Sequence, residues 1–259
     1  MVNCLSNVKF ENLLFVNVRI KEYETIALFD TGAGMTVIAR SVFKKLNVVE
    51  ESEPLTAGNN NGLVRTLQTA IVSNILLGDI LIDELKVIVM DDSDFVFSDE
   101  TGTAFPAEML LGWDVISRYS WKYSAKDGSL SVGISKSAST ASGLDAKQEP
   151  IVFPEYCGYL FKAGVDTGHT SSILNSSWCT RLSDIEYHET EIVGIGSVRY
   201  ESTPYVRNLR ILFQGRAIHL KDVDICDKLY GQPVDMEALL GYDFLEGRDW
   251  QLDQELYLL

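Results

Sequence analysis

Two short Asp-Thr-Gly segments are the residues of this 259-residue chain whose type and spacing could do chemistry. The first is Asp30-Thr31-Gly32 and the second is Asp166-Thr167-Gly168, 136 residues further along. Each aspartate follows an apolar run that heads into the core, so its carboxylate loses hydration and needs hydrogen bonds or a paired function. The glycines permit tight turns that point backbone N–H groups at the carboxylates. We expect the two threonines to hydrogen-bond across a pseudo-twofold axis.

The two segments belong to a longer internal repeat. Leu110-Leu111-Gly112-Trp113-Asp114 is matched by Leu239-Leu240-Gly241-Tyr242-Asp243 at an offset of 129 residues. Small polar residues fill the stretch between the copies, which is typical of a flexible connector. We predict an N-terminal lobe at residues 1–135, a linker at 136–149 and a C-terminal lobe at 150–259.

Strands must position both carboxylates. β-Branched and aromatic residues surround polar turns in 10–29 and again in 66–90, a pattern that predicts β-hairpins. Short helices are expected at 39–46 and 175–182, and after each Leu-Leu-Gly segment. The predicted fold class is therefore all-β with minor helix, built as two related lobes.

With both motifs in matched frames, the chain resembles retropepsin-like and pepsin-like aspartic proteases, with two retropepsin-type lobes fused in one chain. The resemblance implies a bilobal acid-protease fold of two pseudo-twofold-related closed β-barrel lobes with a cleft between them. It also implies that Asp30 and Asp166 form a catalytic dyad, which shares a proton and activates a water to hydrolyse a polypeptide substrate. The residues expected to support this active site are Thr31, Gly32, Ala33, Thr167, Gly168 and His169.

The resemblance further implies a glycine-tipped hairpin, or flap, that closes over the substrate. Segments 56–62 and 193–197 fall at equivalent places in the two copies, although an ordinary hairpin turn has the same composition. The candidate flap and substrate-binding residues are Gly58, Asn59, Asn60, Gly194, Ile195 and Gly196.

His169 departs from the family pattern, which has Ser, Thr or Ala at this place. An imidazole there could crowd the dyad or, when protonated, lower its pKa, or the ring could point to a surface or groove. If His169 disabled the dyad, the chain would be a catalytically impaired acid-protease fold that acts as a peptide-binding module. The sequence leaves this alternative open.

Composition excludes several classes. With 22 Lys+Arg against 37 Asp+Glu and a net charge of −15, the chain lacks the basic surface of a nucleic-acid-binding protein. No apolar run is long enough for a membrane span, and the start shows no export signal, so we expect a cytoplasmic protein. We also expect a monomer, because both aspartates lie in one chain, with no cofactor and no metal. The acidic segment 91–100 is interpreted as a solvated insertion rather than a cation site.

Overall fold

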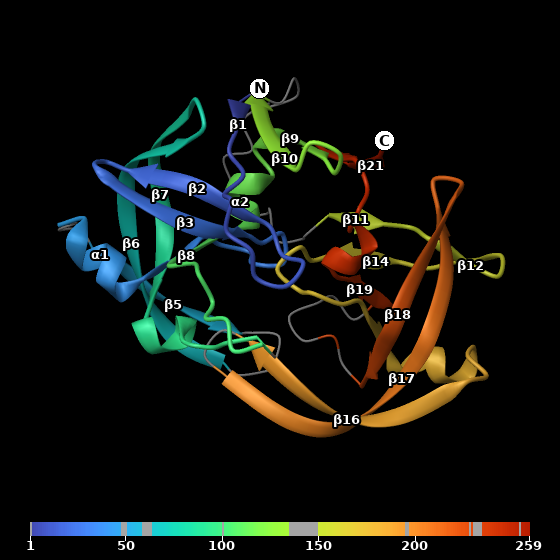
Figure 1. The fold of residues 1–259 in the computed structure, drawn as a ribbon. Coiled ribbons are helices and arrows are strands. Elements are labelled where there is room, and N and C mark those ends of the chain that lie inside the picture. The colour runs from blue at the N-terminus through green and yellow to red at the C-terminus, as the bar shows by residue number, and fades with distance from the viewer. Residues whose placement is uncertain are drawn as a thin grey trace.

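The computed structural model describes residues 2–47, 51–58, 64–99, 101–134, 150–194, 197–227, 229, 235–253 and 255–259. In these residues the strands form three sheets, of seven, nine and five strands. Figure 1 shows the N-terminal half (blue to green) beside the C-terminal half (yellow to red), with both chain ends on the upper side of the view. The predicted all-β, two-lobed class is confirmed.

The N-terminal sheet closes on itself. Its strand order is β2-β3-β8-β4-β7-β6-β5, and β2 also pairs with β6, which joins six of the strands into a barrel. The predicted hairpins are present as β2–β3 and β6–β7. The strands are β2 (Phe15–Ile20), β3 (Tyr23–Phe29), β4 (Val37–Ala39), β5 (Glu51–Gly58), β6 (Val64–Leu77), β7 (Ile80–Met90) and β8 (Met109–Leu111).

The C-terminal sheet is curled but open. Its order is β11-β14-β19-β15-β18-β17-β12-β13, with β16 paired to β17, and within the described residues no pairing joins its two ends. The strands are β11 (Ile151–Val152), β12 (Glu155–Tyr156), β13 (Tyr159–Leu160), β14 (Ala163–Val165), β15 (Ile173–Asn175), β16 (Ile185–Gly194), β17 (Ser197–Phe213), β18 (Arg216–Cys226) and β19 (Ala238–Leu240).

A broken hairpin explains why this second sheet differs from the closed barrel implied by the resemblance. At the repeat offset, β2 corresponds to 151–156, but here the chain forms two strands of two residues each. Pro154 lies between them and has no N–H to donate to a strand ladder. The remaining hairpin, β12–β13, contacts the sheet through one residue pair, Glu155 with Leu212. This pair is equivalent to the closing pair Arg19–Leu76 of the first half, so the sheet stays open because the break at Pro154 separates β12 from β11.

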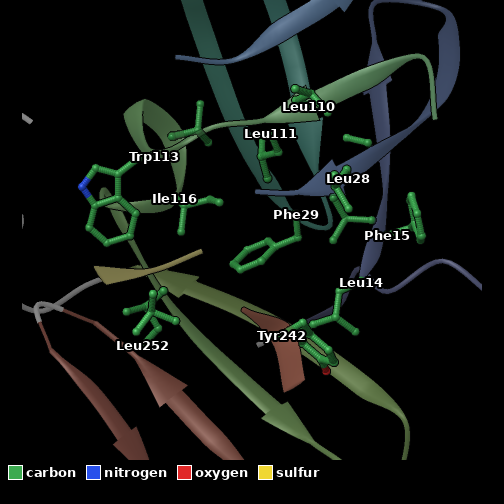
Figure 2. Close-up of a cluster of buried hydrophobic side chains, with 14 of the residues drawn as sticks. Leu14, Phe15, Leu28, Phe29, Leu110, Leu111, Trp113, Ile116, Tyr242 and Leu252 are labelled. Carbon is green, nitrogen blue, oxygen red and sulfur yellow. The ribbon is translucent and has the colours of Figure 1, made fainter. Parts of the chain in front are cut away.

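A five-stranded sheet contains strands from both halves. Its order is β1-β10-β9-β20-β21, so strand β20 from the C-terminal end pairs with β9. Trp121 of β9 and Trp250 of β20 are fully buried and pack on Phe29, at ring-centroid distances of 4.8 and 6.2 Å. Figure 2 shows Phe29 in the surrounding core. The strands are β1 (Val2–Asn3), β9 (Tyr119–Ser124), β10 (Ser129–Ile134), β20 (Trp250–Leu252) and β21 (Leu256–Leu258).

The helices are short. The helix predicted at 39–46 is present as α1, and the one predicted at 175–182 forms a 3₁₀-helix, η2. A single turn also follows each Leu-Leu-Gly segment, as predicted. The helices are α1 (Arg40–Lys45), η1 (Asp92–Phe95), α2 (Trp113–Ile116), η2 (Ser176–Thr180) and η3 (Tyr242–Phe244).

Within residues 91–99 of the acidic segment, exposed side chains flank a buried pair, Asp94 and Phe95. Phe95 is buried, and Phe97 stacks on Phe105 with ring centroids 4.4 Å apart. Asp94 is also buried and accepts two hydrogen bonds from Arg65. The expectation of a solvated insertion holds for the exposed side chains of this segment, such as Asp91 and Asp92, but not for Asp94 and Phe95, which are buried.

The predicted linker, 136–149, lies outside the described residues, so the lobe limits at 135 and 150 stay a prediction. Across the part of the chain that the structure describes, no helix combines the length and apolar character needed to cross a membrane.

Candidate active site

Each aspartate of the two Asp-Thr-Gly segments stands at the end of a buried strand. Asp30 follows β3, which runs parallel to β8, and its backbone N–H donates to the carbonyl of Leu111 (3.1 Å). Asp166 follows β14, which runs parallel to β19, and its N–H donates to the carbonyl of Leu240 (2.8 Å). The last three residues of both strands are buried. The repeat thus builds the same local frame twice.

Two threonines join the turns. The N–H of Thr31 donates to Oγ1 of Thr167 (3.1 Å), and the N–H of Thr167 donates to Oγ1 of Thr31 (3.0 Å). Each hydroxyl also donates at 2.6 Å to a carbonyl of the opposite strand, Thr31 to Val165 and Thr167 to Phe29. The threonines are only 1% and 2% exposed, so water does not compete for these bonds. The hydrogen bonding predicted between them is present.

The two carboxyl groups meet across the glycines of the turns. A Cβ on Gly32 would overlap the carboxyl group of Asp166, and a Cβ on Gly168 would overlap that of Asp30. Neither glycine has a positive φ. Glycine is therefore required for space, because the opposite carboxyl group fills the place of a side chain, and not for an unusual backbone conformation.

Opposing effects act on the pKa of Asp30. Burial raises this pKa well above its ordinary value, and the negative charge of Asp166 and a hydrogen bond between the two side chains raise it further. The N–H groups of Gly32 and Ala33 donate to Oδ1 of Asp30 at 3.0 and 2.9 Å and act in the other direction. The net result is a carboxyl group that keeps its proton to higher pH than a free aspartate.

His169 occupies the place that Ala33 has in the first half, but its contacts differ. The N–H of Ala33 donates to a carboxylate, whereas the N–H of His169 donates to the backbone carbonyl of Asp166 (3.2 Å). The imidazole Nδ1 lies 2.6 Å from the carbonyl oxygen of Ser171, to which it donates when it carries the proton. The ring is therefore hydrogen-bonded within its own loop and does not separate the two carboxyl groups, which contact each other directly.

The Leu-Leu-Gly segments pass directly behind the turns. A Cβ on Gly112 would overlap the backbone of residues 35–36, and one on Gly241 would overlap the backbone of Ser171. The next residue in each segment donates its N–H to a carbonyl of the turn at 2.7 Å; the pairs are Trp113 with Ala33 and Tyr242 with His169. Close backbone packing therefore supports both turns from behind.

Two further carboxyl groups near the turns had no predicted role. Oδ1 of Asp114 accepts the N–H and the O–H of Thr36, at 2.9 and 2.7 Å. Asp243 accepts the N–H and the O–H of Ser172, at 3.0 and 2.7 Å. Burial raises the pKa of Asp114 to about 6 and also raises that of Asp243. The signal was present in the sequence, since an aspartate stands two residues after the glycine of Leu-Leu-Gly in both halves.

The flap candidates fall at the ends of two antiparallel hairpins. Gly58 ends β5 and pairs with Val64 at the start of β6. Gly194 ends β16 and pairs with Ser197 at the start of β17. The other four candidates lie outside the described residues; they are Asn59, Asn60, Ile195 and Gly196. The hairpins that the prediction requires are present, whereas their role as flaps stays a prediction.

Within the described ranges, no group of three or more His, Cys, Asp and Glu residues is placed to hold a metal ion. The acidic residues of segment 91–100 have protein partners instead, such as Arg40 for Asp91 and Thr101 for Asp99.

The fold and the site together define a two-lobed, all-β protein in which two structurally equivalent turns bring two aspartates into contact. Residues 16–118 match the family described as "gag-polyprotein putative aspartyl protease". This segment contains Asp30 and the first Leu-Leu-Gly, so the resemblance to retropepsin-like aspartyl proteases is confirmed there. The match supports aspartic peptidase activity in general and a polypeptide as substrate. No curated protein was found to match the chain.

Proposed function

We propose that the chain is an aspartic endopeptidase in which Asp30 and Asp166 together activate a water molecule against a peptide bond. The observation that carries the proposal is the contact of the two carboxyl groups, each of which lies where the opposite glycine would have its Cβ. Two carboxyl groups in contact cannot both ionise without strong repulsion between their negative charges, so they share one proton and titrate as a pair. Such a pair offers a base and an acid side by side.

The proposed chemistry needs both protonation states at once. The ionised carboxylate takes a proton from water as the water oxygen bonds to the peptide carbonyl carbon, and the protonated carboxyl group donates its proton to the carbonyl oxygen. The carbon–nitrogen bond then breaks as the nitrogen takes up the proton held by one carboxyl group, while a hydroxyl of the tetrahedral intermediate returns its proton to the other, which restores the pair. Asp30 and Asp166 both keep partial solvent exposure, which allows water to reach them.

The substrate in this proposal is an extended polypeptide with apolar residues beside the bond that is cut. The hairpins β5–β6 and β16–β17 would act as the flaps that cover it. Because the Thr31–Thr167 bonds form within one chain, the dyad needs no second copy, which supports an active monomer. A cytoplasmic location is part of the same proposal.

A peptide-binding module without catalysis is the competing function. Its motivation was an imidazole that could disable the dyad. The imidazole of His169 is hydrogen-bonded to the carbonyl of Ser171 in its own loop rather than to the carboxyl groups. This contact favours the enzyme over the binding module.

The direct test replaces each aspartate by its amide. Asp30→Asn and Asp166→Asn should each lower kcat for unfolded polypeptides by about 10³-fold or more, because neither variant can pair an acid with a base. Asp99→Asn is a matched control for Asp30→Asn, since Asp99 is a carboxylate of the same half that hydrogen-bonds to Thr101 and Thr103 in its own loop. Undiminished cleavage by either dyad variant would reject the mechanism. Binding of uncut peptide by the parent chain, without cleavage between about pH 4 and pH 7, would favour the binding module.

A further inference from the structure

Asp114 and Asp243 are carboxyl groups that the proposed chemistry does not use, yet each half partly buries one at the same place. Each stands two residues after the glycine of its Leu-Leu-Gly segment. Taking a carboxyl group out of water costs free energy unless hydrogen bonds replace its hydration. That cost is met twice, in halves whose sheets differ, which indicates a common task.

In the first half, Asp114 holds the far end of the loop that begins at Asp30. Its Oδ1 accepts both donors of Thr36, the backbone N–H at 2.9 Å and the hydroxyl at 2.7 Å. The same hydroxyl oxygen accepts the N–H of Gly112 at 3.1 Å. Thr36 is fully buried, so these bonds tie the loop to the segment behind it without competition from water.

The near end of that loop carries the groups that contact the dyad. The N–H of Trp113 donates to the carbonyl of Ala33 (2.7 Å), and the N–H of Ala33 donates to the carboxylate of Asp30 (2.9 Å). Asp114 is the next residue after Trp113, so one short segment holds both ends of the loop.

The second half repeats this arrangement with different residues. Asp243 accepts the N–H and O–H of Ser172, whose hydroxyl oxygen accepts the N–H of Gly241 at 3.1 Å. The N–H of Asp243 also donates to the carbonyl of Thr170 at 3.3 Å. The loop anchored in this way begins at Asp166, whose carboxylate accepts the N–H of Gly168 at 2.9 Å.

We infer that Asp114 and Asp243 are positioning residues for the dyad, each anchoring the loop whose backbone N–H groups orient the adjacent aspartate. The inference rests on the proposed function and adds to it the residues that keep the two carboxyl groups correctly placed relative to each other. A displacement of about 1 Å at reacting groups can cost roughly 100-fold in rate, so a loop anchor can matter as much as a direct contact.

The anchor depends on an oxygen acceptor rather than on charge. Burial raises the pKa of Asp114 to about 6, and the protonated carboxyl group still presents an oxygen to Thr36. Asparagine presents the same oxygen without a charge, so Asp114→Asn should preserve the anchor. Asp114→Ala removes it and leaves the N–H and O–H of Thr36 without their acceptor.

The experiment measures two quantities in the full chain: cleavage of an unfolded polypeptide, and the titration of the dyad carboxyl groups by ¹³C NMR. Asp114→Ala should lower kcat by roughly 10- to 100-fold with KM within about threefold, and should move the dyad titration by about half a pH unit or more. Asp114→Asn should stay within about threefold of the parent in kcat and leave the titration in place. Asp99→Ala is the matched control, because Asp99 accepts the N–H and O–H of Thr101 in the same way but ties its own loop, at 99–103, rather than a loop that begins at Asp30 or Asp166.

Two results would overturn the inference. One is a folded Asp114→Ala variant with parental kcat and parental dyad titration; the other is an Asp114→Asn variant as impaired as Asp114→Ala. If Asp114→Ala does not fold, Thr36→Val and Thr36→Ser decide by the same criteria, since serine is the residue that the second half uses at this place. If the parent chain cleaves no peptide, the proposed function fails, and the dyad titration of the variants still decides the positioning role.

Discussion

The N-terminal half surrounds its aspartate turn with a closed barrel, whereas the C-terminal half supports the equivalent turn with an open, curled sheet. The turns themselves hardly differ. Both place an aspartate after a buried strand, join it to the carbonyl of a Leu-Leu-Gly leucine, and tie the loop by hydrogen bonds to a second, partly buried aspartate. The halves differ in the side chains that support the turns from further away.

Aromatic packing supports the first half. Phe10 contacts Phe97 and Phe105 edge-on, at ring-centroid distances of 5.9 and 5.4 Å, and Phe105 also contacts Phe15. Through these contacts Phe97 and Phe105 are packed on the barrel. Arg65 lies near the tip of the β5–β6 hairpin, the first flap candidate, and donates two hydrogen bonds to Asp94.

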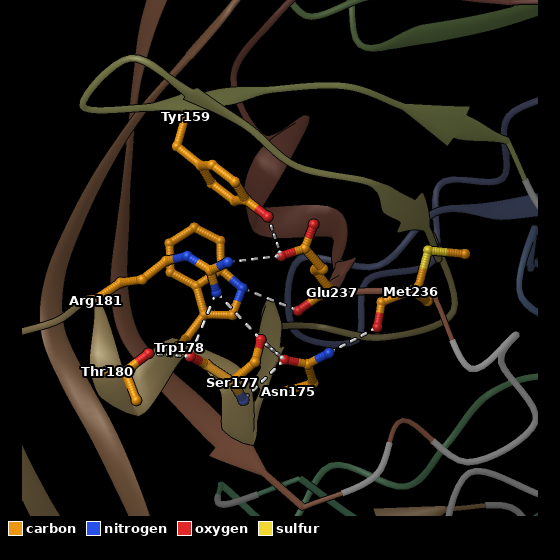
Figure 3. A network of polar contacts seen from close by, with 8 residues as sticks. All are labelled: Tyr159, Asn175, Ser177, Trp178, Thr180, Arg181, Met236 and Glu237. Carbon is orange, nitrogen blue, oxygen red and sulfur yellow. Dashed lines mark hydrogen bonds and ion pairs between the residues drawn. The ribbon is translucent and has the colours of Figure 1, made fainter.

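A polar network supports the second half, as Figure 3 shows. The guanidinium of Arg181 lies over the ring of Tyr159 (4.3 Å) and within 3.6 Å of Glu237. Oε2 of Glu237 also accepts the hydroxyl of Tyr159 at 2.7 Å, and its backbone carbonyl accepts Nε1 of Trp178 at 3.1 Å. Backbone contacts around Asp30 and Asp166 are therefore alike in the two halves, while the side chains that support each turn from further away differ.

The threonine bonds should show the largest effect on stability, and an equal one from either half. Thr31→Val or Thr167→Val removes one hydroxyl and leaves a buried N–H and a buried carbonyl unpaired, which should cost about 2–4 kcal/mol of unfolding free energy. Urea unfolding measures this, with Thr31→Ser as the control that keeps the hydroxyl. Clearly unequal losses would show that the two turns are not equivalent.

Stability should rise on acidification from about pH 7 to pH 5. The pKa of Asp114 is raised from 3.8 to about 6 in the folded chain, so between these values the folded state holds more protons than the unfolded state. The unfolding free energy contributed by this group is therefore complete below about pH 4 and is lost as the pH rises through about 6. Asp243 and Asp30, whose pKa values are also raised, act in the same direction.

The expected gain in unfolding free energy is roughly 1–3 kcal/mol, because a tenfold change in the proton affinity of one group corresponds to about 1.4 kcal/mol. Urea midpoints at the two pH values measure it, and Asp114→Asn, which cannot titrate, should show a smaller pH dependence. Carboxylates with lowered pKa values, such as Asp92 and Asp235, lose their contribution only at lower pH. A parental stability that falls between pH 7 and pH 5 would contradict the assignment.

Two ion pairs should show the smallest effect, and an unequal one: Arg65–Asp94 near the tip of the β5–β6 hairpin, and Arg207–Glu186 at the base of the β16–β17 hairpin. Asp94 has a side-chain exposure of 9% where it meets Arg65, whereas Glu186 and Arg207 of the second hairpin are 48% and 62% exposed. Asp94→Asn should cost about 1–2 kcal/mol and speed amide hydrogen exchange in β6. Glu186→Gln should change exchange in β17 less, because solvent screens an exposed pair. Equal effects would remove this distinction between the hairpins.

Much of the site was predictable because its motifs are local. Aspartate, threonine and glycine stand next to one another in the chain, and their repetition at one offset indicates two equivalent turns. The hairpins at β2–β3 and β6–β7 were predictable for a similar reason, since alternation of apolar and polar residues is read within a few residues. The open second sheet was not predicted, because the effect of Pro154 depends on where strand β17 lies.

Sequence by itself determined which residues form the paired turns, the all-β class and the bonding of Thr31 with Thr167. Tertiary structure decided that Gly32 and Gly168 must lack a side chain to leave room for the opposite carboxyl group. It also decided that Asp114 and Asp243 anchor the loops, and that β9 and β20 join the halves. The physical reason is distance along the chain. A turn is specified by adjacent residues, whereas the space beside a glycine or the partner of a buried carboxyl group is set by residues about 70 or more positions away, once packing has brought them together.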